Sequence, residues 1–193
     1  MKTDQLTKRC GYALAGALVI LGCWHTRALA HDDHGPAQQD LKNKASLVRI
    51  IRESTERFHD VRVAQAEGYA LNFGCVSGSD AGAMGLHFVN GALLNQGVLD
   101  PTRPTIIIYE PLPNGTLRLI GVDFVVFADQ WNASHHDPPQ LMGQLFHLFE
   151  SPNRFGLPTF FTLHVWAWKD NPTGMFVNWH TGVSCEAFNG QNP

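Results

Sequence analysis

The sequence predicts an α+β fold in which a long N-terminal amphipathic helix packs on a mainly antiparallel sheet, with a short C-terminal helix. Apolar residues recur at three- and four-residue spacing over residues 41–67, which indicates a helix. After Tyr69 the spacing becomes two, and glycine and proline mark the turns, which is typical of strands. No internal repeat interrupts the rest, so residues 41–193 are predicted to form a single α+β domain.

The first thirty residues have the layout of a secretory signal peptide. A basic start precedes an apolar run over residues 11–24, and residues 28–30 are Ala-Leu-Ala, which suits a cleavage site. The apolar run is shorter than the roughly 20 residues of a membrane-spanning helix. We therefore expect residues 1–30 to be removed, a secreted or periplasmic protein, and no transmembrane segment in the mature chain. The alternative is a lipid anchor on Cys23.

The charge of the chain excludes some classes of partner. Its formal net charge is −3, and the predicted signal peptide contains four of the 14 basic side chains but one of the 17 acidic ones. The mature chain is therefore more acidic than the whole, and it has no run of basic residues. Such a surface lacks the positive potential with which proteins bind nucleic acid. We expect a small molecule or a metal ion as partner.

The helical part of the chain has clear limits. Residues 31–40 are polar, contain a Gly-Pro step and show no periodicity, so they predict a flexible polar arm. One helix is then predicted over residues 41–67, with opposite charges four residues apart at Arg49 and Glu53. Gly68 ends it. Its apolar face holds Leu47, Ile51, Phe58 and Val61.

The predicted strands follow. Apolar residues alternate at Met84, Leu86 and Phe88, and the Asn114-Gly115 step between residues 105–110 and 116–127 indicates a hairpin. Further strands are predicted over 144–150 and 159–168, after a loop over 128–144.

Two single residues modify this pattern. Gly121, in the middle of a predicted strand, indicates a bulge or a close neighbouring backbone. Pro172 suits the first turn of the short closing helix, predicted through Trp179.

Two histidines on predicted strands form the candidate site. Alternation places four residues on one face of the strand over 159–168, and His87 likewise faces away from Leu86 and Phe88. Were the two strands near each other, His87 and His164 would converge on one cavity. The four residues on that face are Thr162, His164, Trp166 and Trp168.

The cavity is predicted to bind a small ligand or a metal through His87 and His164, with Trp166 and Trp168 as walls. Zinc or copper would need one or two further donors, and His147, Glu110 and Asp123 are the candidates on predicted strands. For Asp123 the alternative is a hydrogen-bonded structural carboxylate. The two histidines lack the spacing of a tight metal motif. The alternative is ordinary core packing, with each imidazole bonded to a local partner.

The cysteines support export. Cys75 and Cys185 are the two that remain after signal cleavage, and a pair of cysteines in an oxidising compartment forms a disulfide. The alternative makes Cys75 a thiolate nucleophile served by a histidine.

Three functions remain open. The first is a non-catalytic domain that binds a small ligand or metal in the His/Trp-lined cavity. The second is a hydrolase or oxidoreductase that uses the same histidines with Glu110 or Cys75. The third is a structural or assembly module whose aromatic face packs on another subunit. Signatures of several enzyme classes, such as GxSxG, a phosphate-binding glycine loop and HExxH, are absent from the sequence.

A set of short motifs runs through the predicted domain in a fixed order. They are Ala66–Tyr69, Cys75, Met84–Asn90, Tyr109–Pro111, Gly143-Gln144, Leu163–Trp168, Asn171–Gly174 and Cys185. This set resembles a family of uncharacterised secreted bacterial proteins. The resemblance covers about residues 41–186 and implies a single exported domain whose pattern includes Cys75 and Cys185; it implies no substrate. One departure is that His180-Thr181 follows Trp179 where members of the family tend to have an Asn-Pro step.

Overall fold

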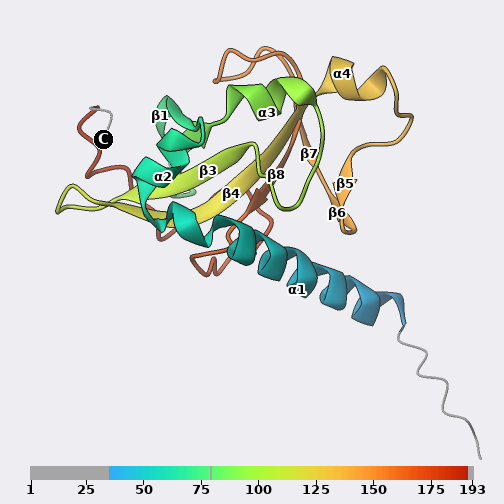
Figure 1. Cartoon of the computed structure of the whole chain (residues 1–193), viewed down its shortest axis with the longest axis horizontal. Coiled ribbons are helices and arrows are strands. Elements are labelled where there is room, and N and C mark those ends of the chain that lie inside the picture. The colour runs from blue at the N-terminus through green and yellow to red at the C-terminus, as the bar shows by residue number, and fades with distance from the viewer. Residues whose placement is uncertain (1–34, 79, 191–193) are drawn as a thin grey trace, which may run out of the picture. The chain divides into compact units, whose positions relative to one another are not determined.

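A computed structural model describes residues 35–78 and 80–190, which combine helices with a curled antiparallel sheet (Figure 1). The predicted signal peptide, with Cys23, and residues 31–34 of the predicted arm lie outside the described residues. None of the helices in the two described stretches has the length and hydrophobicity of a bilayer-spanning segment.

Helix α1 (Pro36–Thr55) begins earlier than the sequence predicts. The prediction of a flexible arm over residues 31–40 is therefore wrong for residues 36–40. Proline is tolerated in a first helical turn, where its missing N–H has no partner to lose. Lys44 forms an ion pair with Asp40 one turn away, at 2.7 Å, which extends helical contacts into this polar segment.

The single helix predicted over residues 41–67 is divided into α1, the 3₁₀ helix η1 (Glu56–His59) and α2 (Val61–Ala66). The backbone leaves the helical region at Thr55 and again at Asp60. The Asp60 side chain accepts a hydrogen bond from the backbone N–H of Arg62, so it caps α2. Periodicity alone did not reveal these breaks, because the apolar residues continue through them.

The main sheet has six antiparallel strands in the order β1-β2-β3-β4-β8-β7, and β5 and β6 form a separate pair. The predicted hairpin is confirmed as β3 and β4, while the strand predicted over 144–150 is divided between β6 and β7. Helix α3 (Gly91–Gln96) was not predicted, and α4 (Ala128–Asn132) lies in the predicted loop. The strands are β1 (Ala70–Ser77), β2 (Ala83–Val89), β3 (Ile106–Pro111), β4 (Leu117–Phe127), β5 (Gln140–Leu141), β6 (Gln144–Leu145), β7 (His147–Phe149) and β8 (Phe160–Val165).

Gly121 allows β4 to meet β8 closely. A Cβ atom at Gly121 would lie 2.6 Å from the carbonyl oxygen of Val165, so any side chain would push the strands apart. The β3–β4 register also shifts between Ile108 and Tyr109, next to this glycine. Both parts of the prediction for Gly121, a bulge and a close backbone, are confirmed.

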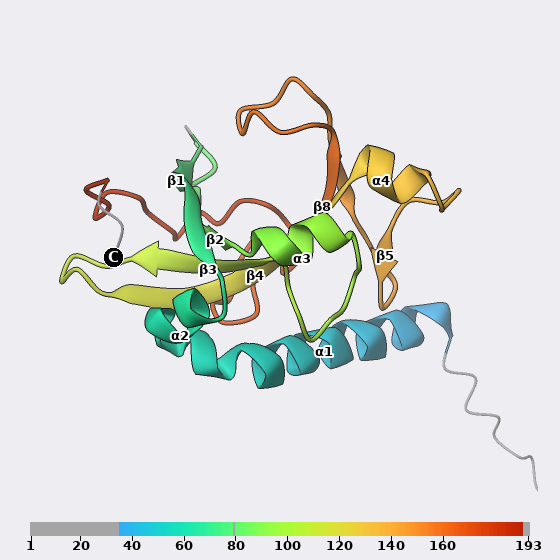
Figure 2. The ribbon, with the colours of Figure 1, turned by 45° about the horizontal axis from the view of Figure 1, so that its top comes forward.

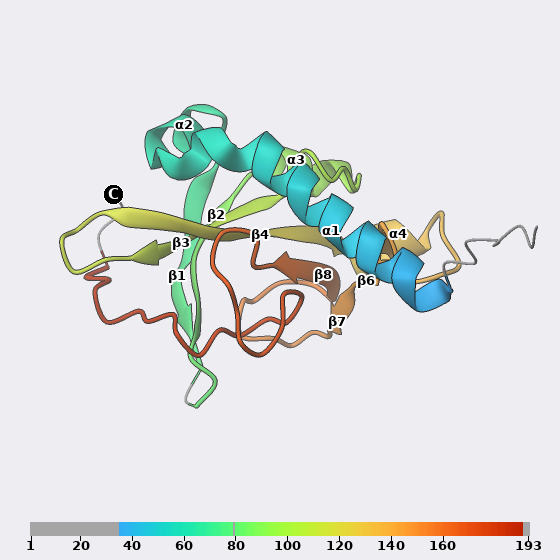
Figure 3. The same ribbon diagram turned by 90° about the horizontal axis from the view of Figure 1, so that it is seen from below.

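The sheet separates two apolar clusters. On one face, α1 and α2 pack on the strands (Figure 2). Leu47 and Ile51 of α1 are fully buried and belong to the same apolar cluster as Ile107 and Val122 of the sheet. On the other face lie the loop over residues 151–157 and the C-terminal segment (Figure 3), and Phe149 of the edge strand β7 packs against the cluster there. The candidate site lies on this second face.

The C-terminal segment contains turns where the sequence predicts a helix from Pro172 to Trp179. Two observations account for the difference: Gly174 has a φ of +133°, which no helix contains, and the Nδ2 of Asn171 donates to the carbonyl of Trp179 and so closes a loop. The segment then pairs His180 with Ala83 of β2 through two backbone hydrogen bonds of 3.2 Å. The disulfide between Cys75 and Cys185 is confirmed. The C-terminal segment is therefore attached to the first two strands.

Candidate metal centre

Three buried side chains from three strands form a cluster on the second face of the sheet. They are His87 of β2, Asp123 of β4 and His164 of β8, and one ligand atom of each lies within 4.8 Å of the others. Asp123 and His164 are direct cross-strand partners. The rings of His87 and His164 are 6.2 Å apart between centroids. The predicted convergence of the two histidines is thus present in the structure.

His87 is held in an orientation that suits a ligand. Its Nδ1 lies 3.1 Å from the carbonyl oxygen of Gly85, so Nδ1–H donates and Nε2 keeps its lone pair. Burial lowers the pKa of His87 to about 4, so the ring is neutral at pH 7. Gly85 is needed here, because its φ is +95° and a Cβ atom would lie 2.6 Å from the carbonyl oxygen of Tyr109.

His164 has an unsatisfied nitrogen. Its Nε2 is buried and has no hydrogen-bond partner among the described residues, which for a buried polar atom costs about 1–3 kcal/mol. Burial lowers the pKa of His164 well below its usual value, and the neighbouring His87 adds to this effect. A neutral imidazole with a free nitrogen is the form that binds metals.

Asp123 is hydrogen-bonded, as predicted, but it also belongs to the cluster. Its Oδ1 accepts a hydrogen bond of 2.6 Å from the hydroxyl of Thr162. Burial nevertheless raises the pKa of Asp123 to about 7, although the bonds from Thr162 and two backbone amides oppose the shift. A cation beside this carboxylate would offset the cost of its buried charge.

The three donors line one cavity of about 50 Å³. The remainder of its lining is mostly apolar and comes from the strands, α3, the loop over residues 151–157 and the C-terminal segment. The other lining residues are Phe73, Met84, Val89, Leu94, Ile106, Val125, Phe149, Phe155, Leu157, Phe160, Thr162 and Asn178.

The two predicted tryptophan walls are not part of this lining. Trp166 packs beside His164 with ring centroids 4.3 Å apart, but its Nε1 donates to the carbonyl of Val177. Trp168 was predicted to lie on the same face of the sheet as His164, and this prediction is wrong. Its Nε1 donates a hydrogen bond to Thr55 of α1, on the opposite side of the sheet. Strand β8 ends at Val165, so the alternation that predicted this face does not reach Trp168.

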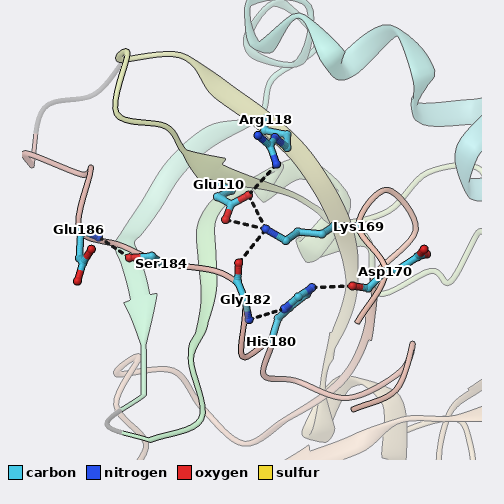
Figure 4. A network of polar contacts seen from close by, with 8 residues as sticks. All are labelled: Glu110, Arg118, Lys169, Asp170, His180, Gly182, Ser184 and Glu186. Atoms are coloured by element: carbon cyan, nitrogen blue, oxygen red, sulfur yellow. Dashed lines mark hydrogen bonds and ion pairs between the residues drawn. The ribbon is translucent and has the colours of Figure 1, made fainter. Parts of the chain in front are cut away.

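Of the three further donors named from the sequence, Asp123 belongs to the cluster, and His147 and Glu110 lie outside it. His147 is exposed on β7. Glu110 of β3 is buried, and both of its oxygens accept hydrogen bonds of 2.8 Å from Lys169 (Figure 4). Arg118 lies 3.7 Å from the same carboxylate. Glu110 is therefore neutralised by cations of the chain and is not available as a ligand.

The Lys169–Glu110 pair fastens the C-terminal segment, since Lys169 also donates to the carbonyl of Gly182 (Figure 4). We expect Lys169→Met to lower the free energy of unfolding by about 2–4 kcal/mol, because it leaves a buried carboxylate without its nearest cation. Urea unfolding would measure this. In a double-mutant cycle, Glu110→Gln should remove much of the penalty; additive losses would show that the pair is not coupled.

The sequence marks Asp123 as unusual, but the alternation of residues along its strand does not show which residue it contacts. A carboxylate in the apolar run Val122–Val126 is costly unless it has a partner. Naming that partner requires the pairing of β4 with β8, which places Asp123 opposite His164. The aromatic lining from Phe149, Phe155 and Phe160 was missed for the same reason, because those residues come from segments whose positions depend on strand order.

Comparison with family models, with curated proteins and with solved structures gives no match for this chain. The resemblance to secreted bacterial proteins stays a prediction.

Proposed function

We propose that the protein is an exported binding protein that holds one divalent transition metal ion, zinc or copper, between His87, Asp123 and His164. The observation that carries the proposal is the buried Nε2 of His164, which has no partner in the described part of the chain, on a ring that offers a ligand atom within 4.8 Å of two further donors. Imidazole and carboxylate are ligands that zinc and copper accept.

The electrostatics support the same conclusion. Both imidazoles are neutral at pH 7, and the buried carboxylate supplies one negative charge when its proton leaves. A tetrahedral zinc ion with bonds of about 2.0–2.1 Å needs donors about 3.4 Å apart. The donors lie within 4.8 Å of one another, so small side-chain movements would complete the set. Hydrogen bonds from His87 to Gly85 and from Thr162 to Asp123 orient two of the three ligands, as outer partners do in metal sites.

Export is supported by the disulfide. A bridge between Cys75 and Cys185 persists where thiols are oxidised, in agreement with the predicted signal peptide. The same bridge argues against the alternative of Cys75 as a nucleophile. The ion pair of Glu110 with Lys169 likewise removes the other partner named for an enzyme. An assembly role for the aromatic face has less support, because Trp166 is fully buried within this chain.

Metal stoichiometry tests the proposal directly. The mature chain, purified without an affinity tag and stripped by chelator, should take up one Zn²⁺ or Cu²⁺ per chain in calorimetry and elemental analysis. A His135→Ala/His136→Ala variant is the control for weak binding at the exposed histidine pair of the loop, and it should retain the ion. A wild type that takes up no metal, or that loses it in this control, would contradict the proposal.

Metal affinity should depend on pH through Asp123. Its pKa of about 7 in the metal-free protein means that a proton occupies the carboxylate below neutrality and must leave when metal binds. Affinity is therefore expected to rise about tenfold per pH unit from about pH 5.5 towards 7, and to level above it. Calorimetry across this range measures the slope. In Asp123→Asn the metal affinity should be low and should no longer change with pH over this range. An unchanged pH dependence would show that the released proton comes from another group.

A further inference from the structure

With three protein ligands, the proposed metal ion would keep one open coordination position. The fold determines the direction from which a fourth ligand can reach that position. The three donors rise from one face of the sheet, with Ile106 and Ile108 of β3 between His87 and Asp123. The backbone of the sheet therefore lies behind the ion. A fourth ligand has to approach from the opposite side, through the cavity that the donors themselves line.

The walls of that cavity recognise an apolar group. Phe149 and Phe160 are stacked at 5.3 Å between centroids, and Phe155 meets Phe160 edge-on at 6.2 Å. Leu157 and Val125 complete the same wall. The residues that line the cavity include no lysine or arginine, so a charged head group would be neutralised by the metal alone.

The lining also includes one exposed aromatic ring. Phe73 of β1 is 44% exposed and lies edge-on to Phe155 at 5.5 Å between centroids. Its φ is +65°, an uncommon conformation for phenylalanine, at a point where the β1–β2 register shifts between Asn72 and Cys75. This irregularity places an apolar ring that is partly exposed to solvent in the lining of the cavity.

We infer that the cavity binds a small monoanion with a short apolar tail, whose anionic head takes the open position on the metal. This inference rests on the proposed metal site. Two neutral imidazoles and one carboxylate leave a divalent ion with one positive charge, which a monoanion cancels in this dry surrounding. One water needs about 10–15 Å³ of such space, so a cavity of about 50 Å³ accepts a tail of only a few carbons.

A chain-length series tests this inference. The whole mature protein, loaded with Co²⁺ as a spectroscopic substitute, is titrated with straight-chain carboxylates from acetate to octanoate, and the cobalt absorption reports the ligand. Affinity should rise about fourfold for each added methylene until the tail fills the cavity, and then level or fall. Phe155→Ala should move the optimum to longer tails, while Leu148→Ala, at an exposed position outside the cavity, should leave it unchanged.

The possible results separate the two proposals. Cobalt uptake with equal affinity for all chain lengths would overturn the apolar tail and leave the metal site standing. Uptake with a length optimum that Phe155→Ala does not move would also overturn it, because the tail would then lie elsewhere. Failure of the wild type to take up cobalt, zinc or copper would overturn the metal site, and the ligand with it.

Discussion

His164→Ala is expected to weaken Zn²⁺ binding by at least about 100-fold. Removing even an outer partner of a metal ligand typically costs 10–100-fold in affinity, and His164 would be a direct ligand, one of three. The fold should tolerate the change, because the replaced ring has an unpaired buried nitrogen whose removal offsets part of the lost packing. Calorimetry with Zn²⁺ gives the affinity, and urea unfolding of the metal-free variant gives the stability.

Two other histidines serve as comparisons for this result. His87→Ala should cause a loss of the same size, since both imidazoles line one cavity. His147→Ala should leave Zn²⁺ affinity unchanged, because this side chain is exposed on β7 and outside the cluster. Equal Zn²⁺ affinities in wild type, His87→Ala and His164→Ala would show that neither imidazole binds the metal and that both rings only pack in the core.

The second large effect is expected from the disulfide. Replacing Cys75 and Cys185 together by serine should lower the free energy of unfolding by about 3–5 kcal/mol. The bridge joins residues 110 positions apart, and cross-links that close long loops restrict the unfolded chain most. Urea unfolding of the metal-free proteins measures the difference.

Reduction of the wild type provides the matched control for this pair of substitutions. Reduced wild type and the double serine variant should unfold at similar urea concentrations, since both lack the same constraint. A loss below about 1 kcal/mol in both would show that the reduced chain is restrained by other contacts. The Lys169–Glu110 pair would then be the first candidate, because it fastens the same C-terminal segment.

The sequence predicted those features that depend on local pattern. The β3–β4 hairpin followed from Asn114-Gly115, and the close approach at Gly121 followed from a glycine inside a strand. The hairpin and the close approach need only neighbouring residues or the period of a strand. Alternation also identified His87 and His164 as the pair to test, but their convergence was predicted only on the condition that the two strands lie near each other.

The features that the sequence did not predict depend on where elements end and how they pair. Trp168 was assigned to the wrong face because β8 ends at Val165. Turns stand in place of the predicted closing helix, because Gly174 has a positive φ and Asn171 bonds to the distant carbonyl of Trp179. Asp123 was one of three candidate donors, and the sequence could not select it over His147 and Glu110, because its proximity to His164 follows from strand pairing.

The attachment of the C-terminal segment to the first strands has a consequence for the order in which the cavity is completed. All three proposed ligands precede residue 165, but the lining also includes Asn178, in a segment joined to β2 at His180 and to β1 at Cys185. A chain synthesised only as far as β8 would contain all three proposed ligands and still lack that wall. Completion of the cavity therefore requires the last part of the chain, and the disulfide then makes its attachment covalent.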